Sequence, residues 1–159
     1  MTANNDKIKN TTLCYIERDG KYLMMHRVKK ENDVNHGKWI GIGGKFERGE
    51  TAFDCAKREI KEETGLTVDN LCYRGVVTFI SDIYETEIMH LFTSKDFSGE
   101  IDYNCDEGIL KWVDKEEVLN LNLWEGDRIF LALLKEDGDF FDLTLIYKGD
   151  KLVEHKFNK

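Results

Sequence analysis

Residues 43–66 constrain the fold of this chain more than any other segment, because a glycine-rich start is followed by a clear helical pattern. Apolar residues recur there at helical spacing, namely at Ala52, Cys55, Ala56 and Ile60. Glu50 and Thr51 are suitable start residues. Gly65 is a suitable stop, since glycine readily takes the left-handed conformation at a helix C-terminus. We therefore expect an amphipathic helix over residues 51–64.

Three glutamates gather on the polar face of this expected helix, towards its C-terminus. Glu62 and Glu63 follow Glu59 at i+3 and i+4, so the three carboxylates lie on neighbouring parts of one face. Like charges at this spacing cost roughly 0.2–0.5 kcal/mol per pair, and the negative end of the helix dipole adds to the conflict. A locally unfavourable arrangement of this kind indicates a functional site.

A bound divalent cation would remove this repulsion, because Mg²⁺ prefers hard oxygen ligands such as carboxylates. Gly43 and Gly44 stand before the helix and allow the backbone to approach a ligand closely. Together these features predict a site for a metal-bound polyphosphate. The alternative is a solvated charged face, which the i,i+4 pairs of Arg58 with Asp54 and with Glu62 would support.

The spacing of the fixed residues in this segment resembles the Nudix box. Gly44 is followed after five residues by Glu50, and after seven more by REIKEETGL at residues 58–66, which matches every fixed position of that box. The resemblance implies an α+β fold, the Nudix α/β/α sandwich with a central mixed β-sheet between helices. It also implies a pyrophosphohydrolase that acts on acid anhydrides in nucleoside diphosphates linked to another group.

The same resemblance implies roles for individual residues. In that family the last three glutamates of the box bind Mg²⁺ or Mn²⁺, often together with the carbonyl of the first glycine. The implied metal ligands are Gly44, Glu59, Glu62, Glu63 and Glu107. The four glutamates are also the implied catalytic residues, with Glu107, expected in a strand, as an additional ligand or the general base. Glu50 and Arg58 usually pair to support the loop against the helix, so Arg58 is expected to be structural.

Outside the box, three segments resemble MutT-type members of the family that hydrolyse oxidised purine nucleoside triphosphates. They are GKWIGIGGK at residues 37–45, the pair Asp106-Glu107 ahead of Trp112, and NLWEGDRIFLALL at residues 122–134. By position in the last of these, Trp124 would stack on the base and Asp127 would hydrogen-bond it.

Two positions depart from that MutT-type pattern. Gly126 stands where those members carry the first of two carboxylic acids, and Ile40 stands where they carry a base-contacting Asn. Both departures weaken the assignment to oxidised purines. The alternative for Trp124 is a place in the core or on a helix-packing surface. The alternative for Asp127 is a carboxylate that is favoured only by the helix N-terminus.

The rest of the chain predicts strands, then helices, and a closing hairpin. Expected strands cover residues 11–18, 21–28, 71–80, 87–97 and 109–113, with an extended glycine-rich stretch at 39–46 and a hairpin at 140–157. Expected helices cover residues 114–121 and 126–137, the second with Ile129, Leu133 and Leu134 facing inward. This order favours a mixed sheet flanked by helices over a regular βαβ alternation.

Composition limits the class of protein. The 159 residues suggest one domain, residues 1–159, with residues 1–10 expected to be disordered. The chain shows no membrane-spanning run, no signal peptide and no CxxC pair, which favours a cytoplasmic protein. The net charge is 23 − 31 = −8, without a basic stripe, so neither a nucleic-acid polymer nor a membrane is an expected partner. We expect a monomer or a homodimer.

The negative charge also bears on phosphate binding, because the field of the protein would repel a free polyphosphate. Metal ions, Arg27 and Lys45 are expected to offset it by contacting the phosphates, although these two cations could equally be solvated at the surface.

The leading hypothesis is Mg²⁺-dependent hydrolysis of a (deoxy)nucleoside triphosphate, such as 8-oxo-dGTP, to the monophosphate and pyrophosphate. The first alternative is another nucleoside diphosphate derivative, such as a nucleotide sugar, ADP-ribose or a dinucleotide. The second alternative is a non-catalytic nucleotide-binding sensor with the same fold. The intact carboxylate cluster argues against the sensor, because a pure binding protein has no need to retain crowded like charges.

Overall fold

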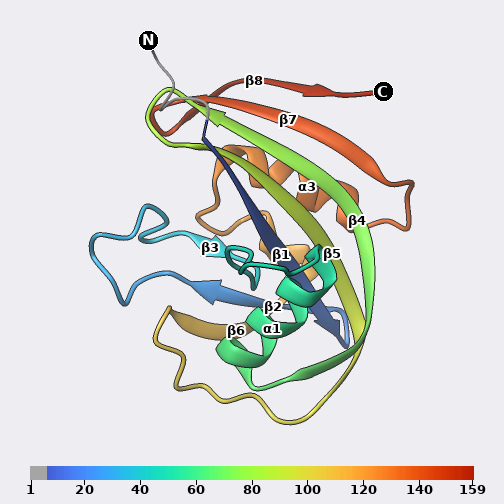
Figure 1. Ribbon diagram of the computed structural model, residues 1–159. Coiled ribbons are helices and arrows are strands. Elements are labelled where there is room, and N and C mark those ends of the chain that lie inside the picture. The colour runs from blue at the N-terminus through green and yellow to red at the C-terminus, as the bar shows by residue number, and fades with distance from the viewer. Residues whose placement is uncertain (1–6) are drawn as a thin grey trace.

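A computed structural model describes residues 7–159 as a mixed sheet with helices on both sides (Figure 1). The strands are β1 (Ile8–Arg18), β2 (Lys21–His26), β3 (Trp39–Ile40), β4 (Thr67–Ser81), β5 (Thr86–Ser98), β6 (Ile109–Asp114), β7 (Phe141–Lys148) and β8 (Lys151–Phe157). The helices are α1 (Ala52–Thr64), α2 (Lys115–Val118) and α3 (Glu125–Leu134). None of the helices among these residues is long and apolar enough to cross a membrane.

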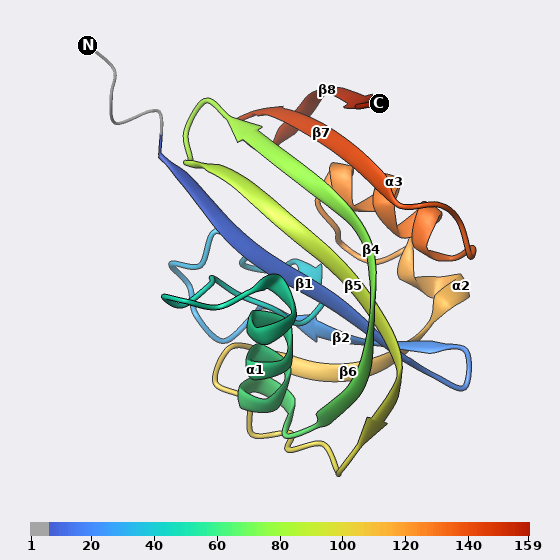
Figure 2. The same cartoon turned by 45° about the vertical axis from the view of Figure 1, so that its right-hand side comes forward.

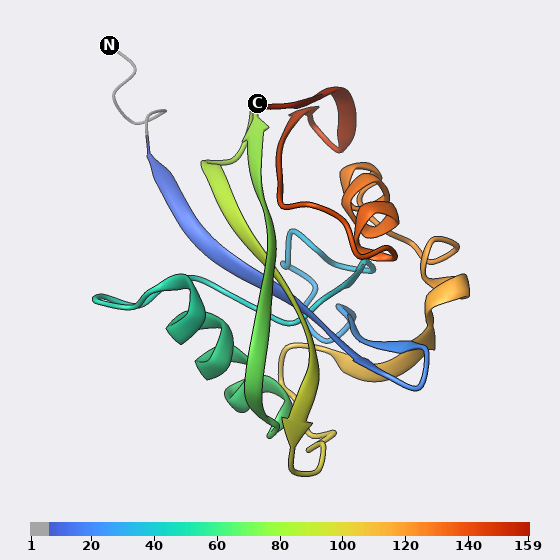
Figure 3. The same cartoon turned by 90° about the vertical axis from the view of Figure 1, so that its right-hand side faces the viewer.

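The sheet has the strand order β3-β2-β1-β5-β4-β7-β8, and β6 pairs with β2. Strands β1 and β5 are parallel, as are β4 and β7, whereas the other pairs are antiparallel. Helix α1 covers one face of the twisted sheet, and α2 and α3 lie on the other side (Figure 2 and Figure 3). The expected α/β/α sandwich with a central mixed sheet is therefore confirmed.

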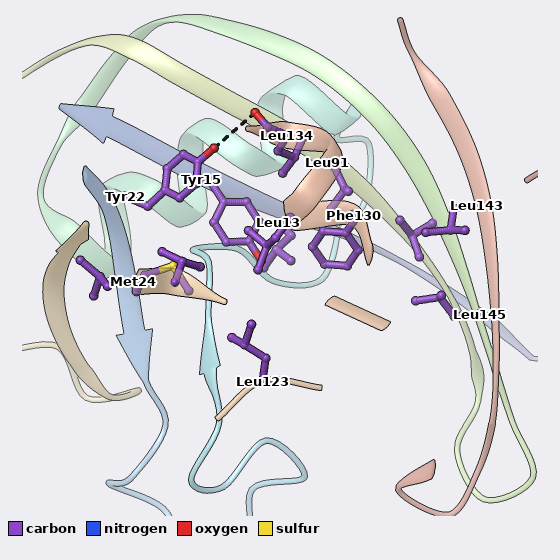
Figure 4. Packing of buried hydrophobic residues seen from close by; sticks show 14 of the residues in the cluster. Leu13, Tyr15, Tyr22, Met24, Leu91, Leu123, Phe130, Leu134, Leu143 and Leu145 are labelled. Atoms are coloured by element: carbon purple, nitrogen blue, oxygen red, sulfur yellow. Dashed lines mark hydrogen bonds between the residues drawn. The ribbon is translucent and has the colours of Figure 1, made fainter. Parts of the chain in front are cut away.

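Two hydrophobic clusters occupy the two faces, and strands β1 and β2 contribute to both. The cluster on the α3 side contains the β1 and β2 residues Leu13, Tyr15, Tyr22 and Met24. The cluster on the α1 side contains the β1 and β2 residues Cys14, Ile16, Leu23 and Met25. Because side chains of a strand alternate between faces, near-continuous apolar runs are required where both faces are covered. Figure 4 shows the α3-side cluster, in which the Tyr22 hydroxyl donates a hydrogen bond to the Leu134 carbonyl at 3.4 Å.

Strand β1 begins earlier than expected. It starts at Ile8 and pairs in parallel with β5 from Ile8 opposite Thr86 onwards. The expectation of disorder is therefore wrong for residues 8–10, because β5 offers an adjacent edge that the sequence pattern did not reveal. Residues 1–6, which fall under the same expectation, lie outside the described residues.

Helix α1 is bounded by the expected residues. Thr51 accepts a hydrogen bond from the Asp54 backbone N–H at 3.1 Å, and Asp54 accepts one from the Thr51 N–H at 3.0 Å. This reciprocal pair satisfies two of the N–H groups that a helix start leaves without a partner. Gly65 ends the helix in the left-handed conformation with φ 82° and donates its N–H to the Lys61 carbonyl. The two ends fix which residues of α1 face the solvent and which face the sheet.

Helix α3 faces the sheet with a different set of residues than expected. Leu134 is buried and Ile129 is half-buried against the core, but Leu133 is exposed over 37% of its surface. The expectation that Leu133 faces inward is therefore wrong. Phe130 and Leu131 are buried instead and join Leu134 in the α3-side cluster, because the packing of α3 turns this face towards the sheet.

The two neighbouring leucines of α3 give a direct test of this orientation. We expect Leu134→Ala to lower the free energy of unfolding by about 2–5 kcal/mol, as buried leucine truncations do. We expect Leu133→Ala to cost less than about 1 kcal/mol, since its side chain loses little burial. Urea denaturation followed by circular dichroism measures both. Equal losses in the two variants would contradict this placement of the helix.

Candidate active site

A single cavity of about 780 Å³ brings together most of the residues singled out in the sequence. At one end it is lined by the carboxylates Glu59, Glu62, Glu63 and Glu107, with Gly43 and Gly44. The expected phosphate-binding residues Arg27 and Lys45 also line it. Further along it is lined by Phe79, Met89, Trp124, Asp127 and Tyr147. This volume lies in the range of small-molecule sites, roughly 300–1,000 Å³.

The glycine-rich loop lies directly against β1 and α1. The Thr12 N–H donates to the Gly44 carbonyl at 2.9 Å, and the Cys55 thiol donates to the same oxygen at 3.5 Å. A Cβ atom on Gly43 would lie 1.8 Å from the Thr12 carbonyl oxygen, and one on Gly44 would lie 2.7 Å from the Glu59 carboxylate. Glycine is therefore required at 43, where the obstacle is backbone, whereas a side chain at 44 would displace the Glu59 carboxylate.

Arg58 connects this loop to the helix. Its Nε and Nη2 donate to the two carboxylate oxygens of Glu50 at 2.6 and 2.9 Å, and Nη2 also donates to the Lys45 carbonyl at 3.0 Å. Its Nη1 donates to Glu59 at 2.8 Å and to Glu62 at 3.1 Å. One guanidinium thus holds the loop and offsets the charge of two neighbouring carboxylates, because its planar fork presents several donors at once. The pairing of Glu50 with Arg58 agrees with the geometry expected from the sequence.

Glu63 is the most deeply placed carboxylate of the cluster. Its Oε2 atom is buried and has no hydrogen-bond partner among the described residues. Burial, followed by the charges of Glu59 and Glu107, raises the pKa of Glu63 to about 8. Burial also raises the pKa of Glu59, against the opposing effect of Arg58. The site therefore concentrates negative charge in a place where ionisation is costly without a nearby cation.

Glu107 lies outside the strand in which it was expected. It precedes β6 in a bend, and β6 begins at Ile109. Its carboxylate lies 3.6 Å from Arg27 Nη2 and 3.2 Å from Lys30 Nζ. Arg27 is in turn held by Asp33 at 2.6 Å. The strand assignment of Glu107 is corrected, because β6 pairs with β2 only from Ile109 onwards.

The cluster fits a hard divalent cation in its chemistry. Among residues 7–159, no three His, Cys, Asp or Glu side chains are already grouped as a set of metal ligands. Arg58 engages Glu59 and Glu62, while Arg27 and Lys30 engage Glu107. The buried Oε2 of Glu63, however, has no hydrogen-bond partner among the described residues, and the carboxylate oxygens around it are the ligands that Mg²⁺ prefers.

The opposite end of the cavity combines an aromatic ring with a buried acid. Trp124 donates its indole N–H to Asn35 Oδ1 at 2.8 Å and packs edge-on to Tyr147, with ring centroids 5.7 Å apart. Lys38 Nζ lies 5.1 Å from the Trp124 ring centroid. Asp127 is buried, and burial, followed by the charge of Glu87, raises its pKa to about 7. Asp127 can therefore carry a proton near neutral pH.

Several lining residues were not identified from the sequence, notably Asn35, Phe79, Met89 and Tyr147. Of these, Tyr147 could have been found from the sequence, because Leu143, Leu145 and Tyr147 occupy alternate positions along β7. The structure shows that all three are buried. Alternation places them on one face of a strand. The face could be predicted, but its position against α3 depends on the parallel pairing of β4 with β7.

Known proteins resemble this chain over most of its length. The NUDIX domain model matches residues 7–134. A Danio rerio protein named oxidized purine nucleoside triphosphate hydrolase is 33% identical over 153 residues, which are 95% of either chain. An uncharacterized Nudix hydrolase of Bacillus subtilis (strain 168) is 29% identical over 88% of this chain and 87% of its own. The crystal structure of a mutator MutT protein from Bacillus halodurans has a TM-score of 0.85 and 27% identity, covering 94% of this chain and 97% of its own.

The chain therefore belongs to the Nudix family and is a Nudix nucleotide hydrolase. Its fold is that of the MutT Nudix proteins, as the sequence resemblance implied. Enzymes of this family generally use divalent metal ions and act on small nucleotide substrates.

The buried acid Asp127 gives a pH-dependent contribution to stability whose sign follows from its pKa. The folded protein retains a proton on Asp127 up to about pH 7, whereas an unfolded Asp loses it near its ordinary value of 3.8. The contribution of Asp127 to the free energy of unfolding therefore falls as pH rises from about 4 to about 7.

We expect Asp127→Asn to remove this part of the pH dependence. Chemical denaturation of wild type and variant, each between pH 4 and pH 8, measures it as a widening difference that favours the variant at higher pH. Asp150→Asn, at an exposed turn residue, serves as the control for removing one carboxylate. Parallel curves for wild type and Asp127→Asn would refute the assignment.

Proposed function

We propose that this enzyme hydrolyses (deoxy)nucleoside triphosphates to the monophosphate and pyrophosphate in a Mg²⁺-dependent reaction, with an oxidised purine such as 8-oxo-dGTP as its substrate. The observation that carries this proposal is the shared cavity, which joins the carboxylate cluster to the end lined by Trp124 and Asp127. A purine nucleoside triphosphate has the same two parts, a polyanion and a flat aromatic base with a polar edge.

The phosphate end binds the metal complex of the triphosphate. The ligands would be Glu59, Glu62, Glu63, Glu107 and the Gly44 carbonyl, and Mg²⁺ or Mn²⁺ bound there would neutralise phosphate oxygens and acidify a water molecule. Arg27 and Lys45 line the same end and would contact phosphate oxygens. A carboxylate of the cluster, Glu63 or Glu107, accepts the proton of the attacking water. Glu50 and Arg58 keep the loop against α1 and do not take part in proton transfer.

The base end orients the nucleoside. Trp124 offers its ring for stacking, and its bond to Asn35 fixes the ring orientation. Asp127, with its raised pKa, can donate or accept a hydrogen bond at the base edge near neutral pH. The name of the Danio rerio relative supports an oxidised purine as the base, since the two proteins match over almost their whole lengths.

A second candidate is another nucleoside diphosphate derivative, such as a nucleotide sugar, ADP-ribose or a dinucleotide. Two observations favour keeping it. Ile40 presents an apolar side chain to the cavity, and Gly126 contributes no carboxylate to it. Fewer polar groups then contact the base than in the MutT-type pattern.

Product analysis separates the two candidates. The enzyme is incubated with Mg²⁺ and a panel of canonical triphosphates, oxidised triphosphates, nucleotide sugars, ADP-ribose and dinucleotides. We expect pyrophosphate and a monophosphate from 8-oxo-dGTP. Release of a sugar phosphate would select the second candidate. Tight nucleotide binding without any turnover would identify a sensor and overturn the proposal.

The carboxylate cluster gives a quantitative test. We expect Glu63→Gln to lower kcat by about 10²–10⁴-fold, the range for loss of a general base, while the fold is retained. Glu154→Gln, which alters an exposed glutamate on β8, should leave kcat unchanged. Removing divalent ions with EDTA should abolish wild-type activity, and added Mg²⁺ should restore it. Full activity in Glu63→Gln would exclude the mechanism.

A further inference from the structure

The base end of the cavity holds a hydroxyl group where the MutT-type pattern carries a carboxylic acid. Gly126 stands at the position of the first acid of that pair, and Asp127 at the second. Tyr147, from β7, is buried and lines the cavity beside both residues. The Tyr147 hydroxyl thus stands in for the acid missing at position 126. It comes from the second half of β7, which is distant in sequence from the start of α3.

The geometry shows that the tyrosine hydroxyl fills the space next to the glycine. The Gly126 N–H donates to Tyr147 Oη at 2.7 Å. A Cβ atom on Gly126 would lie 2.9 Å from Tyr147 Oη and 2.5 Å from the Leu145 Cδ1 methyl group. Any larger residue at 126 would therefore compete with the hydroxyl for the same place. Gly126 and Tyr147 are sterically coupled, so neither can be understood alone.

The hydrogen bonding leaves the hydroxyl proton available. Tyr147 Oη accepts from Gly126, and its own proton meets no acceptor among the described residues. Burial raises the pKa of Tyr147 above its ordinary value, with the charge of Asp127 acting in the same direction. The phenol consequently stays neutral and keeps its proton under physiological conditions. The ring cannot turn away easily, because it packs edge-on against Trp124 and tilted against Phe79.

We propose that Tyr147 is a base-contacting, specificity-determining residue whose hydroxyl donates a hydrogen bond to the 6-oxo oxygen of a purine stacked on Trp124. Asp127 then accepts from the adjacent N–H donors of the same base edge. This inference rests on the proposed function in one respect, namely that the cavity takes a purine nucleotide.

The substitution of a phenol for an acid has a chemical consequence. A pair of carboxylic acids can move its single proton from one member to the other and so suit bases with opposite donor patterns. Tyr147 offers a donor, because the Gly126 N–H occupies one lone pair of its oxygen and its own proton has no acceptor among the described residues. A 6-amino purine presents a donor and no acceptor at this position, so the hydroxyl proton would stay unpaired in a buried site, which is costly. The site is therefore selective for 6-oxo over 6-amino purines.

The test compares wild type with Tyr147→Phe on two bases that differ at this edge. Isothermal titration calorimetry without divalent ions gives Kd for 8-oxo-dGMP and 8-oxo-dAMP, and kinetics with Mg²⁺ give kcat/KM for the triphosphates. We expect Tyr147→Phe to weaken 8-oxo-dGMP binding by about tenfold, as loss of one hydrogen bond does, and to change 8-oxo-dAMP binding less than about twofold. Tyr22→Phe, which removes another buried hydroxyl away from the cavity, should change neither.

The other possible outcomes distinguish failure of the role proposed for Tyr147 from failure of the proposed reaction. Equal losses on both bases, or no loss on either, would overturn the role of Tyr147 and leave it a packing residue. Failure of wild type to bind either monophosphate would also overturn it. Absence of triphosphate hydrolysis together with Tyr147-dependent binding of 8-oxo-dGMP would refute the proposed reaction while supporting the inference.

Tyr147→Phe removes the acceptor of the Gly126 N–H and could therefore prevent folding. A measurement on the wild type alone tests the same hydrogen bond. Wild type is titrated with dGMP and with its 6-thio analogue, because sulfur is a weaker acceptor than oxygen. We expect the 6-thio nucleotide to bind about tenfold more weakly. Equal affinities would overturn the proposed hydrogen bond.

Discussion

The site depends on the bidentate bond between Arg58 and Glu50. This single contact fixes the glycine-rich loop against α1, and the same guanidinium reaches Glu59 and Glu62. Without Arg58, the loop would be linked to α1 only through the weak bond from the Cys55 thiol to the Gly44 carbonyl, and Glu59 and Glu62 would lose the cation that compensates their charge. The helix start and stop then determine where these carboxylates point, since the reciprocal bond between Thr51 and Asp54 and the left-handed Gly65 set the helix in register with the loop. In this segment, the capping bonds of the helix therefore also determine the geometry of the site.

The sheet connects the two ends of the cavity. Strand β1 is covered on both faces, with Tyr15 on the α3 side and Ile16 on the α1 side. Its backbone also carries the glycine-rich loop through the Thr12 N–H. The two ends of the cavity proposed to bind the phosphates and the base therefore share one rigid strand, and their separation is set by close packing and not by a flexible linker. This rigidity suits a reaction in which a base bound at one end must place phosphates at the other.

Much of this architecture follows from local patterns, because caps, turns and alternation are encoded by neighbouring residues. The helix over residues 51–64, the strands expected over residues 11–18 and 21–28, and the paired Glu50 and Arg58 belong to this class. The features that the sequence predicted wrongly all depend on contacts between segments that are distant in the chain. Residues 8–10 become strand because β5 lies beside them, Leu133 faces out because α3 is rotated by its packing, and Glu107 lies in a bend set by β6. Tyr147 could be assigned to an inward face, but no local pattern places its hydroxyl against Gly126.

The parallel pairing of β7 with β4 has a consequence for how such enzymes diverge. The residues matched by the family model end at 134, whereas Leu145 and Tyr147 lie on β7 beyond that point and line or border the cavity. The machinery that defines the family and the strand proposed to contact the base are therefore separate stretches of chain, joined only by tertiary packing. If Tyr147 contacts the base as proposed, mutations in the C-terminal hairpin change which base is accepted while the carboxylate helix stays intact. Two relatives with identical boxes can on this account have different substrates, and the box alone is a poor guide to them.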